Sequence, residues 1–249
     1  MATFKTDFSE FPLNHPWGFA YLAADWSYRF NGICCDDKIQ NDGDIGGQCL
    51  WFDDPMQLMF ISYDGLGTNA NVDILARIRS LNWNYQRIGR MFARATQTDD
   101  ISTAQYYYCQ LDCRNNRIEI WKHLSDGALS QIATAYFSFV AGFWVWVRFR
   151  LSGTSLKAKA WQGGYIGEPV AWHIDIVDGD IGGGGWAGPG GYESCDYDFF
   201  SLGTSGDIAP GPIDTYVNKL TRYNYVKPLH VDEELVPYTL EPQIWPMDF

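Results

Sequence analysis

Positive charge is scarce in this sequence. Its 249 residues include 18 Lys and Arg against 30 Asp and Glu, which gives a formal net charge of -12. A molecule with that field repels nucleic acid and anionic lipid surfaces. We therefore expect neither a nucleic acid nor a membrane as a partner.

Long apolar runs are also missing. The longest nearly uninterrupted one, residues 135–147, contains Ser138 and Gly142 and ends at Arg148, so it is too short to cross a bilayer. The N-terminal MATFKTDFSEF lacks the basic start and apolar stretch of a secretory signal. We expect the mature chain to begin near Met1 in the cytosol where it is made.

Cysteine and histidine are too few and too scattered for a disulfide scaffold or a zinc site. Cys109 and Cys113 lie four positions apart in a strand-like stretch, which separates them by about 13 Å if the strand is straight. Free buried thiols are the favoured interpretation, with one or two disulfides and a metal site as alternatives. No cofactor is predicted. The residues concerned are Cys34, Cys35, Cys49, Cys109, Cys113, Cys195, His15, His123, His173 and His230.

Catalytic motifs are absent from the sequence. No glutamate is followed two positions later by aspartate, as the acid and nucleophile strand of sandwich glycanases requires. The nearest acidic cluster is residues 173–180. There is no Gly-x-Ser-x-Gly elbow or phosphate-binding loop, and GGGGW at 182–186 indicates a flexible loop. We predict that the protein is not an enzyme.

Alternating segments dominate what is present. In FWVWVRFRLSGTSLKAKAW, residues 143–161, a period of two with a turn at 152–154 predicts an antiparallel hairpin. One face of the hairpin is apolar and belongs to the core; the other carries aromatic and cationic side chains. The inward set is Val145, Val147, Phe149, Leu151, Leu156, Ala158 and Ala160, and the outward set is Trp144, Trp146, Arg148, Arg150, Lys157, Lys159 and Trp161.

Further strands follow the same rule, and no amphipathic helix of useful length occurs. Turn residues 114–116 predict a second hairpin, in which Tyr107, Cys109 and Leu111 oppose Tyr106, Tyr108 and Gln110. Residues 1–210 therefore predict an all-β fold, two packed antiparallel sheets in a jelly-roll sandwich. The expected strands are Trp26–Phe30, Cys49–Phe52, Val72–Ile78, Ile88–Ala95, Gln105–Cys113, Ile118–Lys122, Val170–Val177 and Tyr197–Leu202.

Residues 211–249 have a different character. Frequent prolines remove ladder donors and fix φ, so an extended C-terminal arm is expected rather than further sandwich. Its apolar content is too high for a solvated tail, and we expect it to dock in an assembly. The candidate anchors of this assembly arm are Tyr216, Tyr223, Tyr225, Leu229, Leu235, Tyr238, Ile244, Trp245 and Phe249.

Two features leave alternatives open. The hexapeptide DGDIGG occurs at 42–47 and at 178–183, where its carboxylates could bind calcium, although Asp and Gly are also what a tight turn requires. Trp144, Trp146 and Trp161 with their flanking cations could face a glycan, or they could be packed across strands under guanidinium groups. The turn and the packing are the favoured interpretations.

Several stretches together resemble a known family: DFSEF (7–11), NVDILARIRS (71–80), NRIEIWK (116–122), the 143–161 hairpin, EPVAW (168–172) and DYDFFSLGTSGDIAP (196–210). They resemble the concanavalin A-like, laminin-G-like jelly-roll domains of bacteriophage minor structural, decoration and tail-fibre proteins. The resemblance covers roughly residues 7–210 and leaves the arm outside.

The resemblance implies a non-enzymatic virion structural protein assembled in the host cytoplasm. A capsid decoration or cement protein is the favoured hypothesis, docked on the major capsid protein or another virion protein through its arm. A homo-oligomer is expected, with a trimer by analogy. The alternative is a tail-fibre or receptor-binding module that recognises a host-surface glycan.

Overall fold

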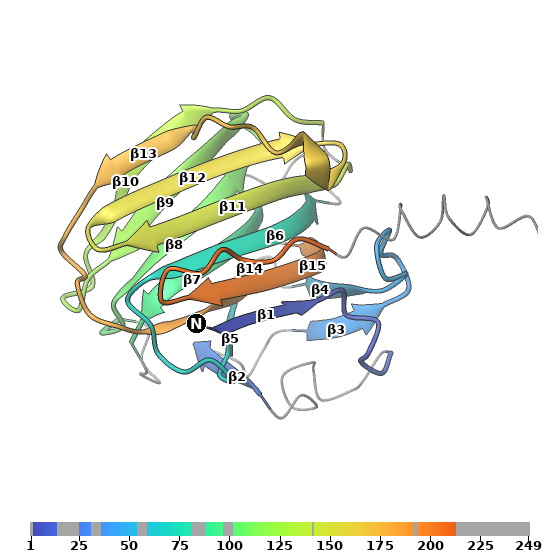
Figure 1. Cartoon of the computed structure of the whole chain (residues 1–249), viewed down its shortest axis with the longest axis horizontal. Helices are drawn as coiled ribbons and strands as arrows, with labels where there is room; N and C mark the ends of the chain where they lie inside the picture. The colour runs from blue at the N-terminus through green and yellow to red at the C-terminus, as the bar shows by residue number, and fades with distance from the viewer. Residues whose placement is uncertain are drawn as a thin grey trace, which may run out of the picture. The chain divides into compact units, whose positions relative to one another are not determined.

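The computed structural model describes residues 2–13, 25–30, 36–53, 59–80, 88–96, 102–140, 142–191 and 194–212. Two antiparallel sheets pack face to face in this part of the chain (Figure 1). The strands are β1 (Ala2–Thr6), β2 (Trp26–Phe30), β3 (Asp36–Gln40), β4 (Cys49–Asp53), β5 (Met59–Tyr63), β6 (Val72–Ser80), β7 (Ile88–Ala95), β8 (Tyr106–Asp112), β9 (Arg117–His123), β10 (Leu129–Tyr136), β11 (Val145–Ser152), β12 (Ser155–Gln162), β13 (Ile174–Val177), β14 (Trp186–Gly191) and β15 (Cys195–Thr204), with a 3₁₀ turn η1 (Tyr165–Gly167).

The eight-stranded sheet forms the front layer in Figure 1, in the order β13-β12-β11-β6-β15-β4-β3, with β1 also paired to β15. The seven-stranded sheet lies behind it in the order β10-β9-β8-β7-β14-β5-β2. The predicted all-β jelly-roll sandwich is therefore confirmed. Within the described ranges no helix is long and apolar enough to cross a membrane.

The core lies between the sheets and has the predicted parity. Val147 and Phe149 are fully buried in it, while their neighbours Trp146 and Arg148 lie on the opposite side of the same strand. In the hairpin β11 pairs with β12 from Val145↔Gln162 to Ser152↔Ser155. The second predicted hairpin is also present, with β8 paired to β9 and Tyr107 on the core side. Alternation alone was sufficient to orient both hairpins.

The structure differs from the prediction in which segments become strands. The strand expected at Val170–Val177 contains only Ile174–Val177, because Pro169 and the residues after it lie across the sheet rather than in its ladder. Five strands were not expected: β1, β3, β5, β10 and β14. Most of them are short or contain few alternating apolar residues, so a period of two gives little signal.

Strand β14 shows why the glycine-rich stretch is not simply a loop. Its sequence WAGPGG lies between β7 and β5 in the middle of the seven-stranded sheet, with a register shift between Trp186 and Gly188. A Cβ at Gly188 would lie 1.9 Å from the carbonyl oxygen of Ile61, so only glycine permits this approach of the two strands. The flexible-loop interpretation fails from Trp186 onward for this reason.

The chain divides into two units, Met1–Pro212 and Ile213–Phe249. All nine predicted arm anchors, Tyr216 to Phe249, lie outside the described residues. Cys34 and Cys35 do so as well, while Cys49, Cys109, Cys113 and Cys195 are free thiols. Burial raises the pKa of Cys49 to about 12, which makes it a poor nucleophile.

Candidate functional site

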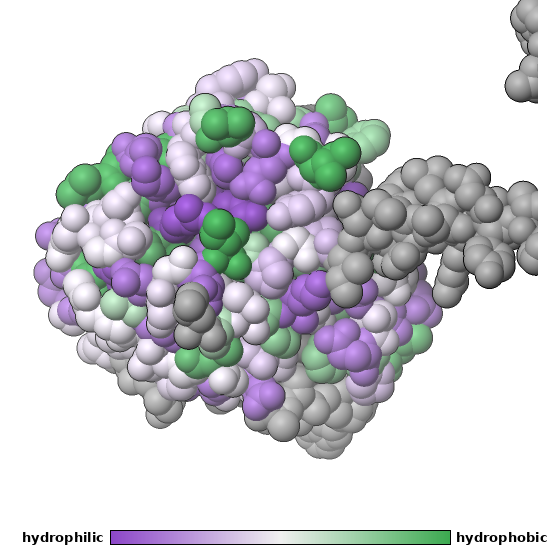
Figure 2. All heavy atoms as spheres, in the orientation of Figure 1, coloured by the Kyte–Doolittle hydropathy of each residue, from purple (hydrophilic) through white to green (hydrophobic). Residues whose placement is uncertain are grey.

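The outer face of the eight-stranded sheet carries the aromatic and cationic side chains of the hairpin. Trp144, Trp146 and Trp161 lie on this face as predicted, but they are only 7%, 2% and 5% exposed. Their rings therefore offer no open surface on which a sugar could stack, which corrects the glycan-facing alternative for these three residues. Figure 2 shows that the surface on this side is mostly polar or neutral, with apolar residues in separate spots.

Two segments outside the strands cover Trp146 and Trp161; we call residues 163–172 and 205–212 the covering segments. The indole N–H of Trp146 donates to the Gly163 carbonyl at 3.1 Å, and that of Trp161 donates to the Gly164 carbonyl at 3.3 Å. The ring of Tyr165 lies 5.4 Å from that of Trp146. Both indoles thus satisfy their polar atom while their apolar surface leaves water.

Arg148 fastens both covering segments to the sheet and is 2% exposed. Its guanidinium donates to both carboxylate oxygens of Glu168, at 2.7 and 3.0 Å, to Asp73 at 3.0 Å and to the Ala209 carbonyl at 3.4 Å. Lys159 adds an ion pair to Glu168 at 2.8 Å and a hydrogen bond to the Pro169 carbonyl at 2.8 Å. The cations of this face therefore hold the protein's own chain.

The carboxylates of this network titrate in opposite directions. Burial favours the neutral form of Glu168, but hydrogen bonds from Lys159 and Arg148 outweigh it and hold its pKa below the ordinary value. Burial raises the pKa of Asp73, despite the opposing charges of Arg148 and Arg150. A carboxylate that is firmly ionised and shared by two cations is suited to structure rather than to proton transfer.

The first DGDIGG repeat is bound at the far end of this face by two arginines. Arg77 contacts Asp44 at 3.1 Å and Asp198 at 2.5 Å, and Arg79 contacts Asp42 at 2.5 Å and Asp196 at 2.7 Å. The guanidinium of Arg79 also lies 4.4 Å from the ring centre of Trp144. These contacts match the favoured packing interpretation, in which guanidinium groups lie over indoles.

Two aspartates of this cluster are almost completely buried. Desolvation raises the pKa of Asp196 to about 6 and that of Asp198 to about 7, against the opposing charges of Arg79 and Arg77. One oxygen of each carboxylate, Oδ1, has no hydrogen-bond partner. The cluster holds more carboxylates than guanidiniums, so protonation of one carboxylate reduces the repulsion among them.

The second DGDIGG repeat is anchored by different residues with the same chemistry. Lys122 pairs with Asp178 at 2.7 Å and also with Asp180, and the Tyr107 hydroxyl donates to Asp178 at 2.5 Å. Arg94 donates to the Ile181 carbonyl at 2.6 Å. Both repeats are therefore turns whose carboxylates bind protein cations. Among the described residues, no group of three or more His, Cys, Asp and Glu is placed to hold a metal ion.

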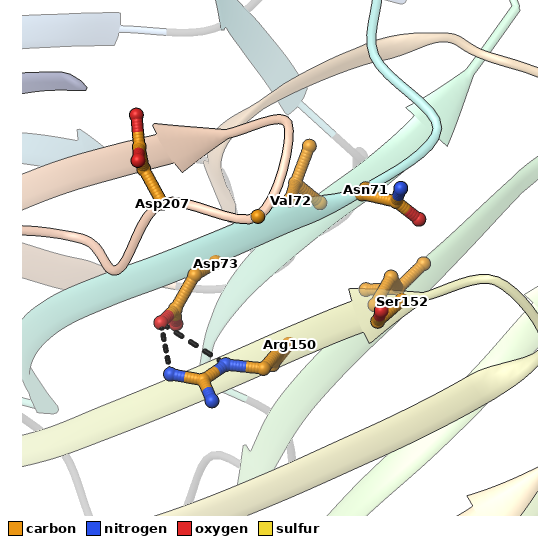
Figure 3. Close-up of a pocket in the computed structure, with 8 residues that line it drawn as sticks. Asn71, Val72, Asp73, Arg150, Ser152 and Asp207 are labelled. Atoms are coloured by element: carbon orange, nitrogen blue, oxygen red, sulfur yellow. Dashed lines mark hydrogen bonds and ion pairs between the residues drawn. The ribbon is translucent and has the colours of Figure 1, made fainter. Parts of the chain in front are cut away.

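A small pocket opens where β6 begins and β11 ends, beside the turn after β15 (Figure 3). Its volume is about 140 Å³, and its lining residues include Asn71, Asp73, Arg150, Ser152 and Asp207. In Figure 3 Asp73 and Arg150 point toward each other, joined by hydrogen bonds of 2.5 and 3.1 Å. Since a water occupies about 30 Å³ of liquid, this volume suits a few waters or a small polar molecule.

The outer face of the seven-stranded sheet holds a second row of aromatic and polar side chains. Arg90 donates to Gln110 at 3.0 Å, and Gln110 donates to Glu119 at 2.6 Å. The indole of Trp121 donates to Glu119 at 2.7 Å and is stacked beside Tyr108 at 6.2 Å between ring centres. The predicted parity placed Tyr108 and Gln110 on this side, but nothing in the sequence showed that they join residues of three strands.

The acidic cluster at residues 173–180 is engaged in ion pairs and hydrogen bonds. Asp175 contacts Lys157 at 2.8 Å, and Asp178 is held by Lys122 and Tyr107. Burial by itself would raise the pKa of the Asp178 carboxyl, but the hydrogen bonds from Lys122 and Tyr107 outweigh burial and hold that pKa below its ordinary value. Such a group is not poised to give up or accept a proton near neutral pH.

No family model and no curated protein matches the chain. Solved structures share its fold at low sequence identity. The carbohydrate-binding module CBM66 from Bacillus subtilis has a TM-score of 0.51 and 14% identity, covering 70% of this chain and 91% of that one. The exoplasmic/lumenal domain of VIP36 in its Ca²⁺/Man-bound form has a TM-score of 0.50 and 12% identity, covering 81% and 92%. These likenesses establish the jelly-roll sandwich of the concanavalin A-like type.

Proposed function

We propose that this chain is a non-enzymatic structural protein of a bacteriophage particle, of the capsid decoration type. The sandwich is the displayed body, and residues 211–249 attach it to the major capsid protein or to another virion protein. The sequence resemblance over residues 7–210 is the reason for placing it in a virion.

The observation that carries the proposal is that two segments of the sandwich itself cover the aromatic and cationic part of its outer face. Arg148 and the tryptophans bind residues 163–172 and 205–212, so the outer face of the eight-stranded sheet is already covered before the chain reaches Ile213. The separate unit from Ile213 onward then brings further large apolar side chains, among them the nine candidate anchors. In water these side chains would form an adhesive apolar surface, so we infer that a partner protein covers them.

The energetics favour attachment through several arms. Each large anchor gains about 1.5 to 3 kcal/mol on burial, and ordering an extended chain offsets much of that sum. A single arm is then a modest contact. Arms that act together from an oligomer, each raising the effective concentration of the next, make the attachment durable.

Truncation after Pro212 tests this function. It keeps Ala209, whose carbonyl binds Arg148, and it removes only the second unit. The truncated protein should fold with the parental melting temperature but be absent from purified particles, as measured by mass spectrometry of gradient-purified virions. A full-length variant with Trp245→Ser and Phe249→Ser should be incorporated at a reduced level. Parental incorporation of the truncated chain would remove the arm as the attachment element.

A second candidate function is glycan recognition by the outer face of the seven-stranded sheet. Tyr108, Gln110 and Glu119 of this row are buried, so Trp121, which is half-buried and donates to Glu119, is the ring of the row that a sugar can contact. Two structures of similar fold, a carbohydrate-binding module and a mannose-bound lumenal domain, favour this class. In that case the truncated chain binds host cells, Trp121→Ala abolishes that binding, and the more buried Trp161→Phe leaves it unchanged.

Absence of hydrolysis is part of the same proposal. Both acidic candidates of the sequence, Asp175 and Asp178, are engaged by lysines. Purified protein should release no reducing ends from β-glucan, alginate or host polysaccharide. Release that Asp175→Asn or Asp178→Asn abolishes would show that the protein is a glycanase after all.

A further inference from the structure

Strand β10, Leu129–Tyr136, forms one edge of the seven-stranded sheet. Among the described strands it pairs only with β9, and Figure 1 shows it at the border of the sandwich beside β13. Large apolar side chains are exposed on it and on the loop that follows: Leu129 is 50% exposed, Tyr136 73%, Val140 60% and Phe143 64%. A free edge with apolar side chains is a template for pairing with another strand.

This edge also lacks the features with which proteins protect their edges. Between Asp126 and Arg148 the sequence contains no charged residue and no proline. The other border strands each carry charge: β13 has Asp175, β3 has Lys38 and two aspartates, and β2 has Arg29. Edge strands are commonly blunted by charge, proline or a bulge, and β10 has only the bulge between Gln131 and Ala133.

The pattern of exposure along β10 is symmetric about its centre. From Leu129 to Tyr136 the side chains are exposed, half-buried, exposed, half-buried, and then the same in reverse. The bulge shifts the alternation by one residue, which produces this mirror order. A strand with such a pattern matches itself when it is turned end for end.

We propose that β10 is a self-association edge, on which the β10 strands of two copies of this chain pair antiparallel about a two-fold axis and join their seven-stranded sheets. In the centred register Leu129 of one copy faces Tyr136 of the other, and Gln131 faces Thr134. The first pair is aliphatic on aromatic and the second is polar on polar, which are favourable cross-strand combinations. Ser130 faces Ala135, so small side chains meet on the inner side.

The net charge of the chain favours a second copy of the same chain as the partner that pairs with β10. The whole chain carries -12, so two copies repel each other over most of their surfaces. A strand without charge is a place where they can approach without placing like charges opposite one another. The same lack of charge gives no electrostatic attraction toward a strongly charged partner. An isologous edge closes at two copies, so this contact produces a dimer rather than the trimer expected by analogy.

A charge pair at two facing positions tests the proposal on the full-length protein. Gln131→Lys combined with Thr134→Lys places lysines opposite each other twice in the dimer. Gln131→Lys combined with Thr134→Glu places opposite charges there instead, at the same two positions, and keeps a donor beside Glu119, to which the Gln131 amide donates at 3.3 Å. Sedimentation equilibrium should give a dimer for the parent, a dissociation constant at least tenfold higher for the first variant, and a parental or tighter dimer for the second.

The controls separate this contact from general effects. The double-lysine variant has a net charge of -12 + 2 = -10, which by itself reduces repulsion, so weaker association must arise at the edge. Gln131 and Thr134 are exposed, and circular dichroism and melting temperature should match the parent in both variants.

Three results would overturn the proposal. A parent that is monomeric at about 100 μM has no such edge contact, and a trimer insensitive to both variants associates elsewhere. A monomeric parent whose double-lysine variant no longer joins particles would show that a strand of another protein occupies the edge. The first two outcomes do not depend on the arm and leave the proposed function to its own truncation test; the third also measures incorporation, so it is interpreted together with that truncation.

Discussion

At the centre of β11 the two faces of the eight-stranded sheet are almost equally buried but chemically opposite. Val147 and Phe149 on the inner face are 0% exposed, and Arg148, between them on the outer face, is 2% exposed. The inner face is covered by another sheet and is apolar throughout. The outer face is covered by residues 163–172 and 205–212, which are held by ion pairs and hydrogen bonds to indoles and cations.

The difference shows that burial and hydrophobicity are separate properties of a strand. A regular sheet presents few free polar groups, so an apolar surface is sufficient to bind it. An irregular segment brings unpaired carbonyls such as those of Gly163, Pro169 and Ala209, and each must find a donor as it leaves water. Arginine, lysine and tryptophan side chains supply those donors.

The largest effect should come from placing a charge on the inner face. Phe149→Asp puts a carboxylate among the buried apolar side chains of the core, which costs several kcal/mol and is comparable with the whole stability of a domain. We expect an unfolded or insoluble protein, judged by circular dichroism and thermal melting. A folded variant with the parental melting temperature would show that the inner and outer faces have been assigned the wrong way round.

Acidification should stabilise the outer face through Asp198. Its folded pKa is raised to about 7, above the ordinary 3.8, so the folded state binds the proton more tightly; the resulting stability is fully present below pH 3.8 and is lost as the pH rises through 7. The groups that face it are Arg77 and Asp44. Asp196, raised to about 6, acts in the same direction.

Asp198→Asn should therefore reduce this pH dependence. The full shift corresponds to a change on the order of 4 kcal/mol between pH 4 and pH 8, of which pH 5 to 8 contains the larger part. Chemical denaturation of parent and variant at pH 5, 6, 7 and 8 measures it. Glu168 and Asp178 have lowered pKa values and oppose the trend below pH 5, which is why the series stops there. Equal slopes for parent and variant would contradict the assignment.

Removing Arg148, the central cation of the outer face, should lower the free energy of unfolding by somewhat less than the pH-dependent change expected from Asp198. Arg148→Met leaves two carboxylates that keep other partners, since Asp73 retains Arg150 and Glu168 retains Lys159. Loss of one partner of a buried pair costs about 3 to 5 kcal/mol, and we expect the lower end of that range in urea denaturation. Arg150→Met, at a site where the side chain is 33% exposed, is the matched control and should cost clearly less.

Alternation in the sequence was sufficient to predict which side chains lie on each face of the sheet, but not whether the outer face is covered. Alternation placed Trp146 and Arg148 opposite Val147, and that is confirmed. Whether the outward residues meet water depends on residues 163–172 and 205–212, which have no period of their own and whose path is fixed only by tertiary hydrogen bonds. The tryptophans were thus located correctly, but their burial could not be predicted.

Other differences have the same origin. Strand β14 contains Pro189 and three glycines, so its propensity argues against a strand, yet the close approach to Ile61 requires Gly188. The row of Arg90, Gln110 and Glu119 depends on the register of three strands, which a single sequence does not reveal. The mirror pattern of β10 depends on a bulge, and a bulge likewise emerges only from pairing.

The smallest effect should come from the uncovered end of the same outer face. Lys157 lies two residues before Lys159 on β12 with the same parity, but it pairs with Asp175 at 2.8 Å where the two side chains are 31% and 54% exposed. An exposed pair of this kind contributes about 0 to 1 kcal/mol and is screened by salt. Lys157→Ala should therefore change the free energy of unfolding by about 0.5 kcal/mol or less, and less still in 0.5 M NaCl. Lys159→Ala removes the hydrogen bond to the Pro169 carbonyl and the partly buried ion pair to Glu168, and it should cost more than 1 kcal/mol with less salt dependence than an exposed pair. If the two substitutions cost the same, residues 163–172 do not cover the face in solution, and the contrast between Lys157 and Lys159 is lost.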